Sequence, residues 1–269
     1  MKYVYLALIF VLFSCKENSK TVPVVEEVNE GIVYEEYTGE EPTKPEETEV
    51  YQPVPPVVRL INDKGVPSDA KILFNNNSLN EWVSVENPNK IAEWTINADS
   101  SFTVKNKAGD IRTKDEFGDV QLHLEWRSPE KIEGEGQHRG NSGVFLQGRY
   151  EVQILDNNDN DTYVNGQVAS IYKQHIPLVK ASVPSGQWNA YDIIYRAPEF
   201  DKRGNKTKSG TITVLQNGIL VQDHVEIKGT TPYIGWPKNE PHGKGPIILQ
   251  DHGDNSRVSF RNIWVRELN

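Results

Sequence analysis

The sequence predicts an all-β domain in which two antiparallel sheets form a sandwich. Many short segments alternate apolar and polar residues with a period of two, are rich in Val, Ile, Tyr and Trp, and are bounded by Gly, Asn, Asp or Pro. Helical periodicity is nearly absent. Because many strands at regular spacing with tight turns are typical of sandwiches, we expect this class rather than an α/β fold. The predicted strands lie in residues 94–106, 119–128, 142–148, 149–156, 188–198, 210–227, 245–252 and 258–268.

Two tight turns can be assigned from their residues. Asn217 and Gly218 tolerate positive φ at both central positions, which a type I′ hairpin requires. Gly148 suits the first central position of a type II′ turn. The last predicted strand carries Val258 and Phe260 on one face, so we expect the C-terminus to enter the core.

The first fifteen residues have the features of a signal peptide. Lys2 supplies a positive start, and the apolar run that follows is too short to span a bilayer as a mature helix. The run ends in LFSC, which resembles a lipobox, and Cys15 is the only cysteine among the 269 residues. We therefore expect a lipoprotein anchored in the bacterial cell envelope, at the outer membrane or the periplasmic face, through acyl chains on Cys15. The alternative is an ordinary secreted protein with one spare thiol.

Residues 16–56 differ in composition from the rest of the chain. Eleven Glu against three Lys give this segment −8 of the net charge of −9, and it is rich in Pro and Thr. Such a self-repelling segment extends in solution, so we expect an acidic tether that acts as a solvated spacer. Residues 57–269 are long enough for one large domain, and their near-neutral charge gives no basic face for nucleic acid.

Four blocks of the folded domain resemble one protein family. The blocks are LFNNNSLNEW, HRGNSGVFLQGRYEVQILDN, GQWNAYDIIYRAPEFD and GPIILQDHGDNSRVSFRNIWVREL. They are similar to the signature blocks of the 3-keto-disaccharide hydrolase domain family, in the family's order from Ala70 to Leu268. The resemblance implies a curved jelly-roll sandwich related to concanavalin A-like lectins and glucanases, whose concave sheet binds sugar. It also implies cleavage of glycosides whose glucose ring has first been oxidised at C3.

One strand of the second block carries a carboxylate and an amide on the same face. Glu151 and Gln153 are two residues apart, hence about 7 Å along a strand that is otherwise mostly apolar. Lectin-like jelly-roll hydrolases that cleave unmodified glucans place two acids on such a strand, because protonating the leaving oxygen and attacking the anomeric carbon are separate tasks. Gln153 can do neither, so it would orient a sugar hydroxyl, and a conventional retaining mechanism would need an acid from another loop.

A glycoside with a ketone at C3 needs only one base. The ketone acidifies the C2 proton, so a general base can remove it and the leaving group departs from C1 by β-elimination, after which water can add. We expect Glu151 to be this base, with His138, Arg139 and Asn141 of the preceding loop donating to the developing enolate. The alternative is that Glu151 forms a structural ion pair with Arg149 or Arg139.

Two further polar groups are candidates for the same site. In LQDHG, His252 could protonate the leaving group while Gln250 and Asp251 hold ring hydroxyls. Alternatively, Asp251 caps the turn and His252 packs. In IYKQHIPL, Lys173 could polarise the ketone or simply line the groove, together with His175.

The tryptophans divide into two groups. Trp82, Trp188 and Trp236 are candidate stacking platforms for pyranose rings, whereas Trp126 and Trp264 lie on regular predicted strands and are expected in the core.

No spacing of histidines and acids assembles a metal site locally. There is no HxH or HxxxH motif, and the oxygen-rich stretch 156–161 lacks the glycine and closing glutamate of an EF-hand. We therefore expect no cofactor and no tightly bound metal.

The expected activity is cleavage of 3-keto-glucosides or 3-keto-disaccharides, by elimination with possible hydration. Two alternatives remain at this point: a non-catalytic, lectin-like sugar-binding surface lipoprotein, and a conventional two-carboxylate glycosidase acting on unoxidised sugars.

Overall fold

The computed structural model describes residues 41–61, 65–74 and 77–268, so the candidate anchor Cys15 lies outside the described residues. The chain divides into two compact units, one reaching to Tyr51 and the other running from Gln52 to Leu268. The described part of the first unit contains the short 3-10 helix η1 (Pro45–Glu47). Within the described ranges, no helix has the length and apolarity needed to cross a bilayer.

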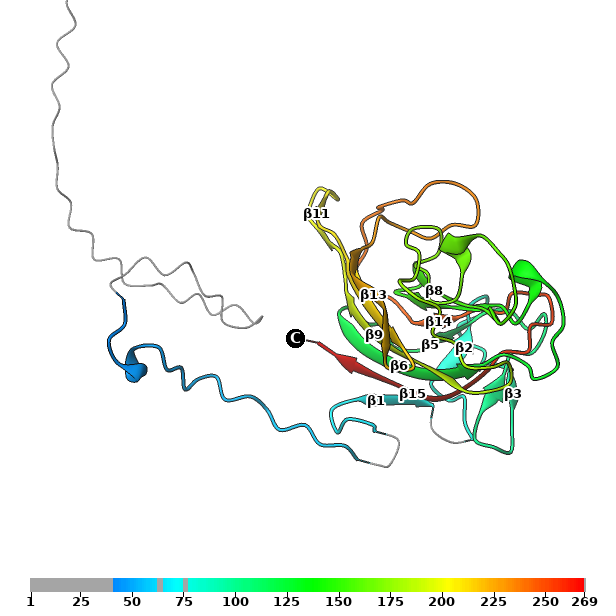
Figure 1. Ribbon diagram of the computed structural model, residues 1–269, viewed down its shortest axis with the longest axis horizontal. Helices are drawn as coiled ribbons and strands as arrows, with labels where there is room; N and C mark the ends of the chain where they lie inside the picture. The colour runs from blue at the N-terminus through cyan, green and yellow to red at the C-terminus, as the bar shows by residue number, and fades with distance from the viewer. Residues whose placement is uncertain (1–40, 62–64, 75–76, 269) are drawn as a thin grey trace, which may run out of the picture. The chain divides into compact units, whose positions relative to one another are not determined.

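The second unit is a sandwich of two antiparallel sheets, which lie one above the other in Figure 1. In the described residues, the larger sheet consists in spatial order of β13 (Ile219–Glu226), β12 (Thr211–Gln216), β9 (Asn189–Arg196), β6 (Val120–Arg127), β15 (Ser259–Glu267), β4 (Phe102–Thr103) and β3 (Thr95–Ile96), with β1 (Lys71–Phe74) also paired to β15. The smaller sheet consists of β2 (Trp82–Ser84), β5 (Ile111–Thr113), β14 (Ile248–Leu249), β7 (Ser142–Leu146) and β8 (Tyr150–Ile154). The predicted all-β antiparallel sandwich is confirmed.

Short elements connect and extend the two sheets. A separate ribbon pairs β10 (Glu199–Phe200) with β11 (Lys206–Lys208). Two 3-10 helices, η2 (Gly136–His138) and η3 (Val164–Gly166), flank β7 and β8 in the chain.

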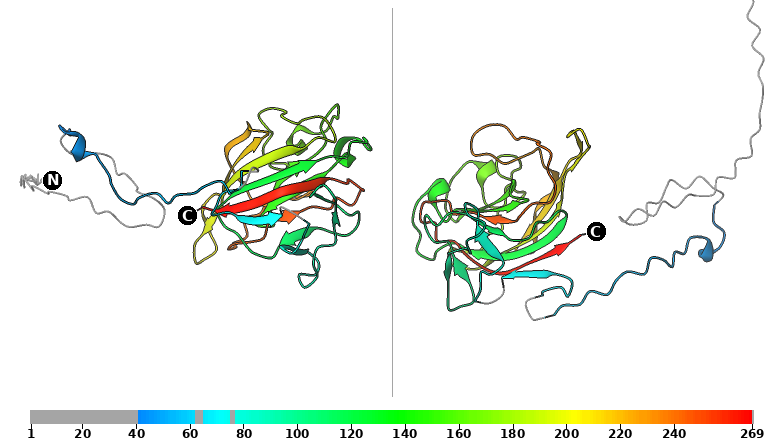
Figure 2. Two further views of the ribbon diagram at one scale, coloured as in Figure 1. Left: turned by 90° about the horizontal axis from the view of Figure 1, so that it is seen from below. Right: turned by 180° about the vertical axis from the view of Figure 1, so that it is seen from behind.

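Alternation of side chains orients the long central strands. In β6, buried and half-buried residues alternate along all eight positions, because successive side chains of a strand point to opposite faces. Leu122, Leu124 and Trp126 therefore enter the core, and β9 contributes Tyr191 and Ile193 in the same way. Figure 2 shows β15, in red, beside the green β6 in the view from below.

An aromatic cluster fills one end of the core. Phe102 is fully buried and lies 4.6 Å from Phe74, 5.6 Å from Phe260 and 5.9 Å from Trp94, measured between ring centroids. Trp82 is also fully buried, and its indole N–H donates to the carbonyl of Leu73 at 3.0 Å. The expectation that Trp82 stacks on a sugar ring was therefore wrong, because β2 turns this side chain into the core.

The C-terminal strand enters the core as predicted, with one irregularity. The register between β15 and β6 shifts between Arg261 and Trp264, and Asn262 adopts a positive φ of 47°. This bulge reverses the alternation, so Ile263 and Trp264 are both buried.

The two predicted turns have different outcomes. Asn217 and Gly218 have φ values of 54° and 76°, as a type I′ turn requires. In the turn between β7 and β8, Gln147 (φ 51°) and Gly148 (φ 65°) both lie in the left-handed region. The prediction of a type II′ turn was therefore wrong, because Gly148 is the second central residue and not the first. The buried amide of Gln147 holds this conformation, because its Oε1 accepts from the hydroxyl of Tyr195 at 2.6 Å.

Replacing Phe102 by alanine should destabilise the domain by about 3–5 kcal/mol, because the aromatic cluster would be left with a cavity. The free energy of unfolding in urea measures the effect. Ile194→Ala is the matched control, since Ile194 is 42% exposed and its truncation should cost no more than about 0.5 kcal/mol. Equal losses in both variants would contradict this account of the core.

Candidate active site

The strand that carries Glu151 is buried on both faces although it is the last strand of the smaller sheet. Tyr150, Val152 and Ile154 point into the core, as alternation requires. Glu151 and Gln153 point to the opposite face, yet they are only 4% and 1% exposed. This face is therefore covered by other parts of the chain, and we call it the covered face.

Two segments cover β8. The first runs along its free edge, where the backbone N–H of Ala169 donates to the carbonyl of Gln153 and that of Tyr172 donates to the carbonyl of Glu151. The second reaches β8 through Thr231, whose Oγ1 accepts from the backbone N–H of Glu151 at 3.1 Å. Both segments complete the hydrogen bonding of the edge strand and bring polar side chains over it.

Gly143 leaves the space that the Glu151 carboxyl occupies. The two strands pair so that Gly143 lies opposite Gln153, one step along the covered face from Glu151. A Cβ atom added to Gly143 would overlap the Oε1 atom of Glu151. Any other residue at position 143 would therefore displace the carboxyl.

The carboxyl of Glu151 is strongly perturbed. Burial, with a smaller contribution from the charge of Asp110, raises the pKa of Glu151 from 4.5 to about 8. In the described part of the chain, no cation lies within ion-pair distance of it. Arg139 contacts Asp156 instead, at 3.5 Å, and Arg149 donates to the carbonyl of Gln147. The alternative of a structural ion pair for Glu151 is not found among the described residues.

Asp110 is an acidic neighbour that sequence reasoning missed. It directly precedes β5 and accepts from the backbone N–H of Asp251 at 2.8 Å. Burial raises the pKa of Asp110 as well, and the charges of Asp251 and Glu86 act in the same direction. In the sequence it follows Gly109, a pattern typical of an ordinary turn, so no local signal distinguishes it.

Strand register places the site residues in two rows across the smaller sheet. One row contains Arg112, Ile248, Phe145 and Glu151, which are successive partners. The other row contains Gln250 and Gly143, joined by a backbone hydrogen bond of 3.1 Å, and Gln153, the partner of Gly143. Paired residues point to the same face, so both rows lie on the covered face.

Several polar atoms in these rows have no hydrogen-bond partner among the described residues. They are the buried Oε1 atoms of Gln153 and Gln250 and the buried Nε of Arg112. An unpartnered buried polar atom is costly, and such atoms are retained mainly where a ligand or water completes them. Glu151 lies on the same face as these unpartnered atoms, a combination typical of a surface that binds a hydroxyl-rich molecule.

The amide of Gln153 is held by a residue that the sequence analysis did not single out. Its Nε2 donates to Oε1 of Gln137 at 2.9 Å and to the carbonyl of Gly166 at 3.2 Å. Asn141 is part of the same network, because its Nδ2 donates to the carbonyl of Gln137 at 2.7 Å. Asn141 therefore supports the loop and does not point a free donor at Glu151.

Lys173 forms a cluster with three tyrosines, and the charge of Glu151 acts on two of them, raising the pKa of Tyr163 and of Tyr172. The Lys173 ammonium donates to the carbonyl of Tyr233 at 2.6 Å and lies 4.7 to 5.6 Å from the ring centroids of Tyr233, Tyr172 and Tyr163. The hydroxyls of Tyr163 and Tyr172 are 2.6 Å apart. Burial raises the pKa of Tyr172, and its hydrogen bond to Tyr163 and the charge of Glu151 raise it further, so both tyrosines stay neutral donors.

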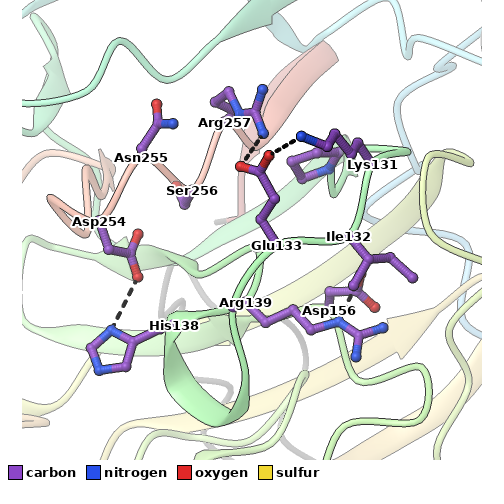
Figure 3. Close-up of a pocket in the computed structure, with 13 residues that line it drawn as sticks. Lys131, Ile132, Glu133, His138, Arg139, Asp156, Asp254, Asn255, Ser256 and Arg257 are labelled. Carbon is purple, nitrogen blue, oxygen red and sulfur yellow. Dashed lines mark hydrogen bonds and ion pairs between the residues drawn. The ribbon is translucent and has the colours of Figure 1, made fainter.

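The two predicted catalytic histidines come together at one end of this region. His138 Nδ1 lies 3.4 Å from Oδ2 of Asp254 (Figure 3), and His252 Nδ1 lies 2.7 Å from the same carboxylate oxygen. Burial acts to raise the pKa of Asp254, but the hydrogen bond and charge of His252, with those of His138, hold it below its ordinary value. Asp254 was not among the predicted residues.

Other predicted site residues have local structural contacts. Arg139 lines a cavity of about 310 Å³ together with His138 and Asp254, but its guanidinium is buried against Asp156. Asp251 accepts from the backbone N–H groups of Gly109 and Gly253 and so caps its turn. His175 is bonded through Nε2 to the carbonyl of Glu226.

The two remaining tryptophan platforms lie in different surroundings. The guanidinium groups of Arg127 and Arg261, which belong to the larger sheet, lie over the Trp188 ring at 4.5 and 4.2 Å from its centroid. The structure does not bring it to Glu151. Trp236 is 88% exposed at the tip of the loop that supplies Tyr233.

The raised pKa of Glu151 predicts a specific pH dependence of stability. Between pH 4.5 and about 8 the unfolded chain releases the Glu151 proton while the folded chain retains it, so the free energy of unfolding falls as pH rises. Relative to Glu151→Gln, the native chain should lose up to about 5 kcal/mol across this window, and no more above it. Urea unfolding of both chains at pH 4, 6, 8 and 9 measures the difference. A difference that does not vary with pH would show that Glu151 titrates normally.

Comparison with known proteins agrees with this architecture. Residues 69–266 match the family of the 3-keto-alpha-glucoside-1,2-lyase-like domain. A crystal structure of a putative glycosyl hydrolase from Parabacteroides distasonis is 53% identical, with a TM-score of 0.81, over 86% of this chain and 99% of that chain. A second from the same organism is 25% identical, with a TM-score of 0.51, over 74% and 99% of the two chains. No curated protein matches the chain. With the match spanning nearly the whole described domain, the chain belongs to the 3-keto-alpha-glucoside-1,2-lyase-like domain family.

Proposed function

We propose that the domain cleaves the glycosidic bond of 3-keto-glucosides by elimination, with Glu151 as the general base. The observation that carries this proposal is the buried carboxyl of Glu151, which has no cation within ion-pair distance among the described residues and shares its covered face with unpartnered polar atoms. With LFSC at Cys15, we extend the proposal to a lipid-anchored protein acting in the cell envelope.

The reaction needs one general base to remove the C2 proton and hydrogen-bond donors to the C3 oxygen. Glu151 removes the proton from C2, and the electron pair of the C2–H bond forms a C2=C3 double bond while negative charge develops on the C3 oxygen. The enolate then collapses: the C3 ketone returns, a C1=C2 double bond forms, and the C1–O bond breaks with its electron pair leaving on the aglycone oxygen. A proton on that oxygen and later addition of water across C1=C2 complete hydrolysis.

The surroundings of Glu151 suit both the removal of the C2 proton and the stabilisation of the enolate. A pKa of about 8 matches a base that works near neutral pH, because proton transfer is most efficient when the two values are close. The hydroxyls of Tyr163 and Tyr172 are hydrogen-bonded to each other, which leaves one neutral O–H to donate to the enolate oxygen, and the Lys173 ammonium, 5.3 Å from the Tyr172 ring, is a second donor. Gln153 and Gln250 offer carbonyl oxygens to ring hydroxyls.

The proximity of Asp110 to Glu151 supports a second candidate, a two-carboxylate glycosidase. In that mechanism one acid is protonated and the other stays ionised as nucleophile or base. Here burial raises the pKa of both, and neither has a cation partner within ion-pair distance in the described residues. Chemistry with a lone base therefore fits the electrostatics better.

The proposal is tested with a 3-keto-glucoside that carries a chromogenic aglycone, beside its unoxidised parent, in D2O. We expect aglycone release from the keto sugar alone and deuterium at C2 of the recovered 3-keto-glucose. An enzyme-free incubation of 3-keto-glucose corrects for spontaneous exchange. Release from the parent sugar would favour the two-carboxylate candidate, and binding without release from either sugar would leave a sugar-binding module.

Glu151→Gln should lower kcat for the keto-glucoside by at least about 100-fold, because the base is lost while the shape of the site is kept. Binding of the same sugar, followed by calorimetry, should change little. Glu199→Gln is the matched control, since Glu199 lies in the separate β10–β11 ribbon and pairs with Lys208 at the surface. Full turnover by Glu151→Gln would remove Glu151 from the mechanism.

A further inference from the structure

We infer that His138, His252 and Asp254 form a site for one divalent transition-metal ion. His138 ends η2, whereas His252 and Asp254 follow β14, so the three residues come from segments more than a hundred residues apart. One ligand atom from each, two imidazole nitrogens and one carboxylate oxygen, lies within 4.8 Å of the other two. Because the group forms only in three dimensions, our expectation of no metal, drawn from local spacing, could not have detected it.

The separations suit a metal with short bonds. Zinc binds imidazole nitrogen at about 2.0–2.1 Å and carboxylate oxygen at about 2.0–2.2 Å, so neighbouring ligand atoms of a tetrahedral site are about 3.4 Å apart. The contact between His138 Nδ1 and Asp254 Oδ2 already has that length, 3.4 Å. The contact of His252 Nδ1 with the same oxygen is a hydrogen bond of 2.7 Å, which an ion would replace after opening it by less than 1 Å.

The carboxylate of Asp254 is incompletely satisfied by the protein. Both histidine contacts go to Oδ2, while Oδ1 is buried and has no hydrogen-bond partner among the described residues. A second carboxylate oxygen free of other partners can complete a bidentate or water-bridged ligand. Nitrogen and oxygen donors in a two-to-one ratio favour zinc, manganese or iron over calcium, which prefers oxygen ligands.

The arrangement leaves a coordination position open. The side chain of His138 is 75% exposed, and the cavity of about 310 Å³ is lined by both His138 and Asp254 (Figure 3). Three protein ligands with a free fourth position are typical of catalytic zinc sites, whereas structural sites are closed by four. The ion could therefore bind a substrate oxygen or a water molecule.

Two contacts connect this cluster to the covered face. Gln137, the neighbour of His138, accepts from Gln153, and Gln250, two residues before His252, donates its backbone N–H to Gly143. The cluster thus lies at the end of the row that also contains Gln153. Resting on the function proposed above, we assign the ion the role of a Lewis acid that binds a substrate oxygen lone pair without a change of oxidation state.

Direct metal binding tests the site without reference to activity. The whole chain is stripped with a chelator, titrated with Co2+ while the visible absorption of tetrahedral cobalt is followed, and then titrated with Zn2+ in competition with a chromophoric chelator. We expect one ion per chain, displacement of Co2+ by Zn2+, and no competition from Ca2+. His138→Ala, His252→Ala and Asp254→Asn should each weaken Zn2+ binding at least about 100-fold. Absence of a one-to-one complex would overturn the proposal.

A matched control separates ligand loss from general effects of histidine removal. His224 is exposed on β13, outside the cluster, so His224→Ala should bind Zn2+ like the native chain. An equal loss in His224→Ala would also overturn the proposal. Thermal unfolding of each metal-free variant should match that of the metal-free native chain, which identifies a variant that merely fails to fold.

Keto-glucoside turnover, measured in the same preparations, distinguishes the two proposals. Turnover that needs Glu151, falls at least tenfold on metal removal and returns with one ion supports both. One-to-one binding of the metal ion without turnover of the keto-glucoside would support the metal site and contradict the proposed reaction. If no ion is bound and turnover is equal in the native chain and in His252→Ala, the proposed reaction is supported and the metal site is contradicted.

Discussion

The burial of one carboxyl on a strand that is covered on both faces is the constraint on which the rest of the site depends. An edge strand of a sandwich ordinarily leaves one face and one edge to water. In β8 the edge is paired by the segment around Tyr172 and the outer face is covered, so Glu151 has lost most of its hydration, and no described residue supplies a cation to it. Desolvation without compensation costs stability, and this cost is the cause of the raised pKa.

The same cover suits the proposed chemistry. Where water is excluded, a donor such as the buried Tyr172 hydroxyl acts more strongly on a developing negative charge than it would in solvent. Gly143 is the local condition for this arrangement, because a side chain at that position would occupy the space of the carboxyl. The core-facing side chains of β8 hold the strand in the sandwich. The two segments that cover its other face exclude water from Glu151.

Period-two patterns were enough to predict the fold class and the long strands, because the central strands β6, β9 and β12 of the larger sheet each have one buried face and one more exposed face. They also placed Glu151 and Gln153 on a common face. They could not show that this face is covered, since the covering residues are distant in sequence.

Asp110 and Asp254 were missed for the same reason: each lies in a turn, where an acidic residue is ordinary, and only the tertiary structure gives it a second role. Trp82 shows the opposite error, because aromatic content alone does not tell a core residue from a sugar platform.

The distribution of unpaired polar groups argues further for the covered face as the functional one. On the outer face of the larger sheet, His123 contacts Asp192 at 2.7 Å and Arg261 pairs with Glu125 at 2.6 Å, while the buried Oδ1 of Asn262 and Nε1 of Trp264 have no hydrogen-bond partner among the described residues. On the covered face, Glu151 lacks a cation and the carbonyl oxygens of Gln153 and Gln250 lack donors among the described residues. Unpartnered buried atoms therefore occur on both faces, and what distinguishes the covered face is that it also buries a carboxyl with no cation within ion-pair distance among the described residues. This combination is the reason for placing the proposed sugar site at Glu151 and not on the outer face of the larger sheet.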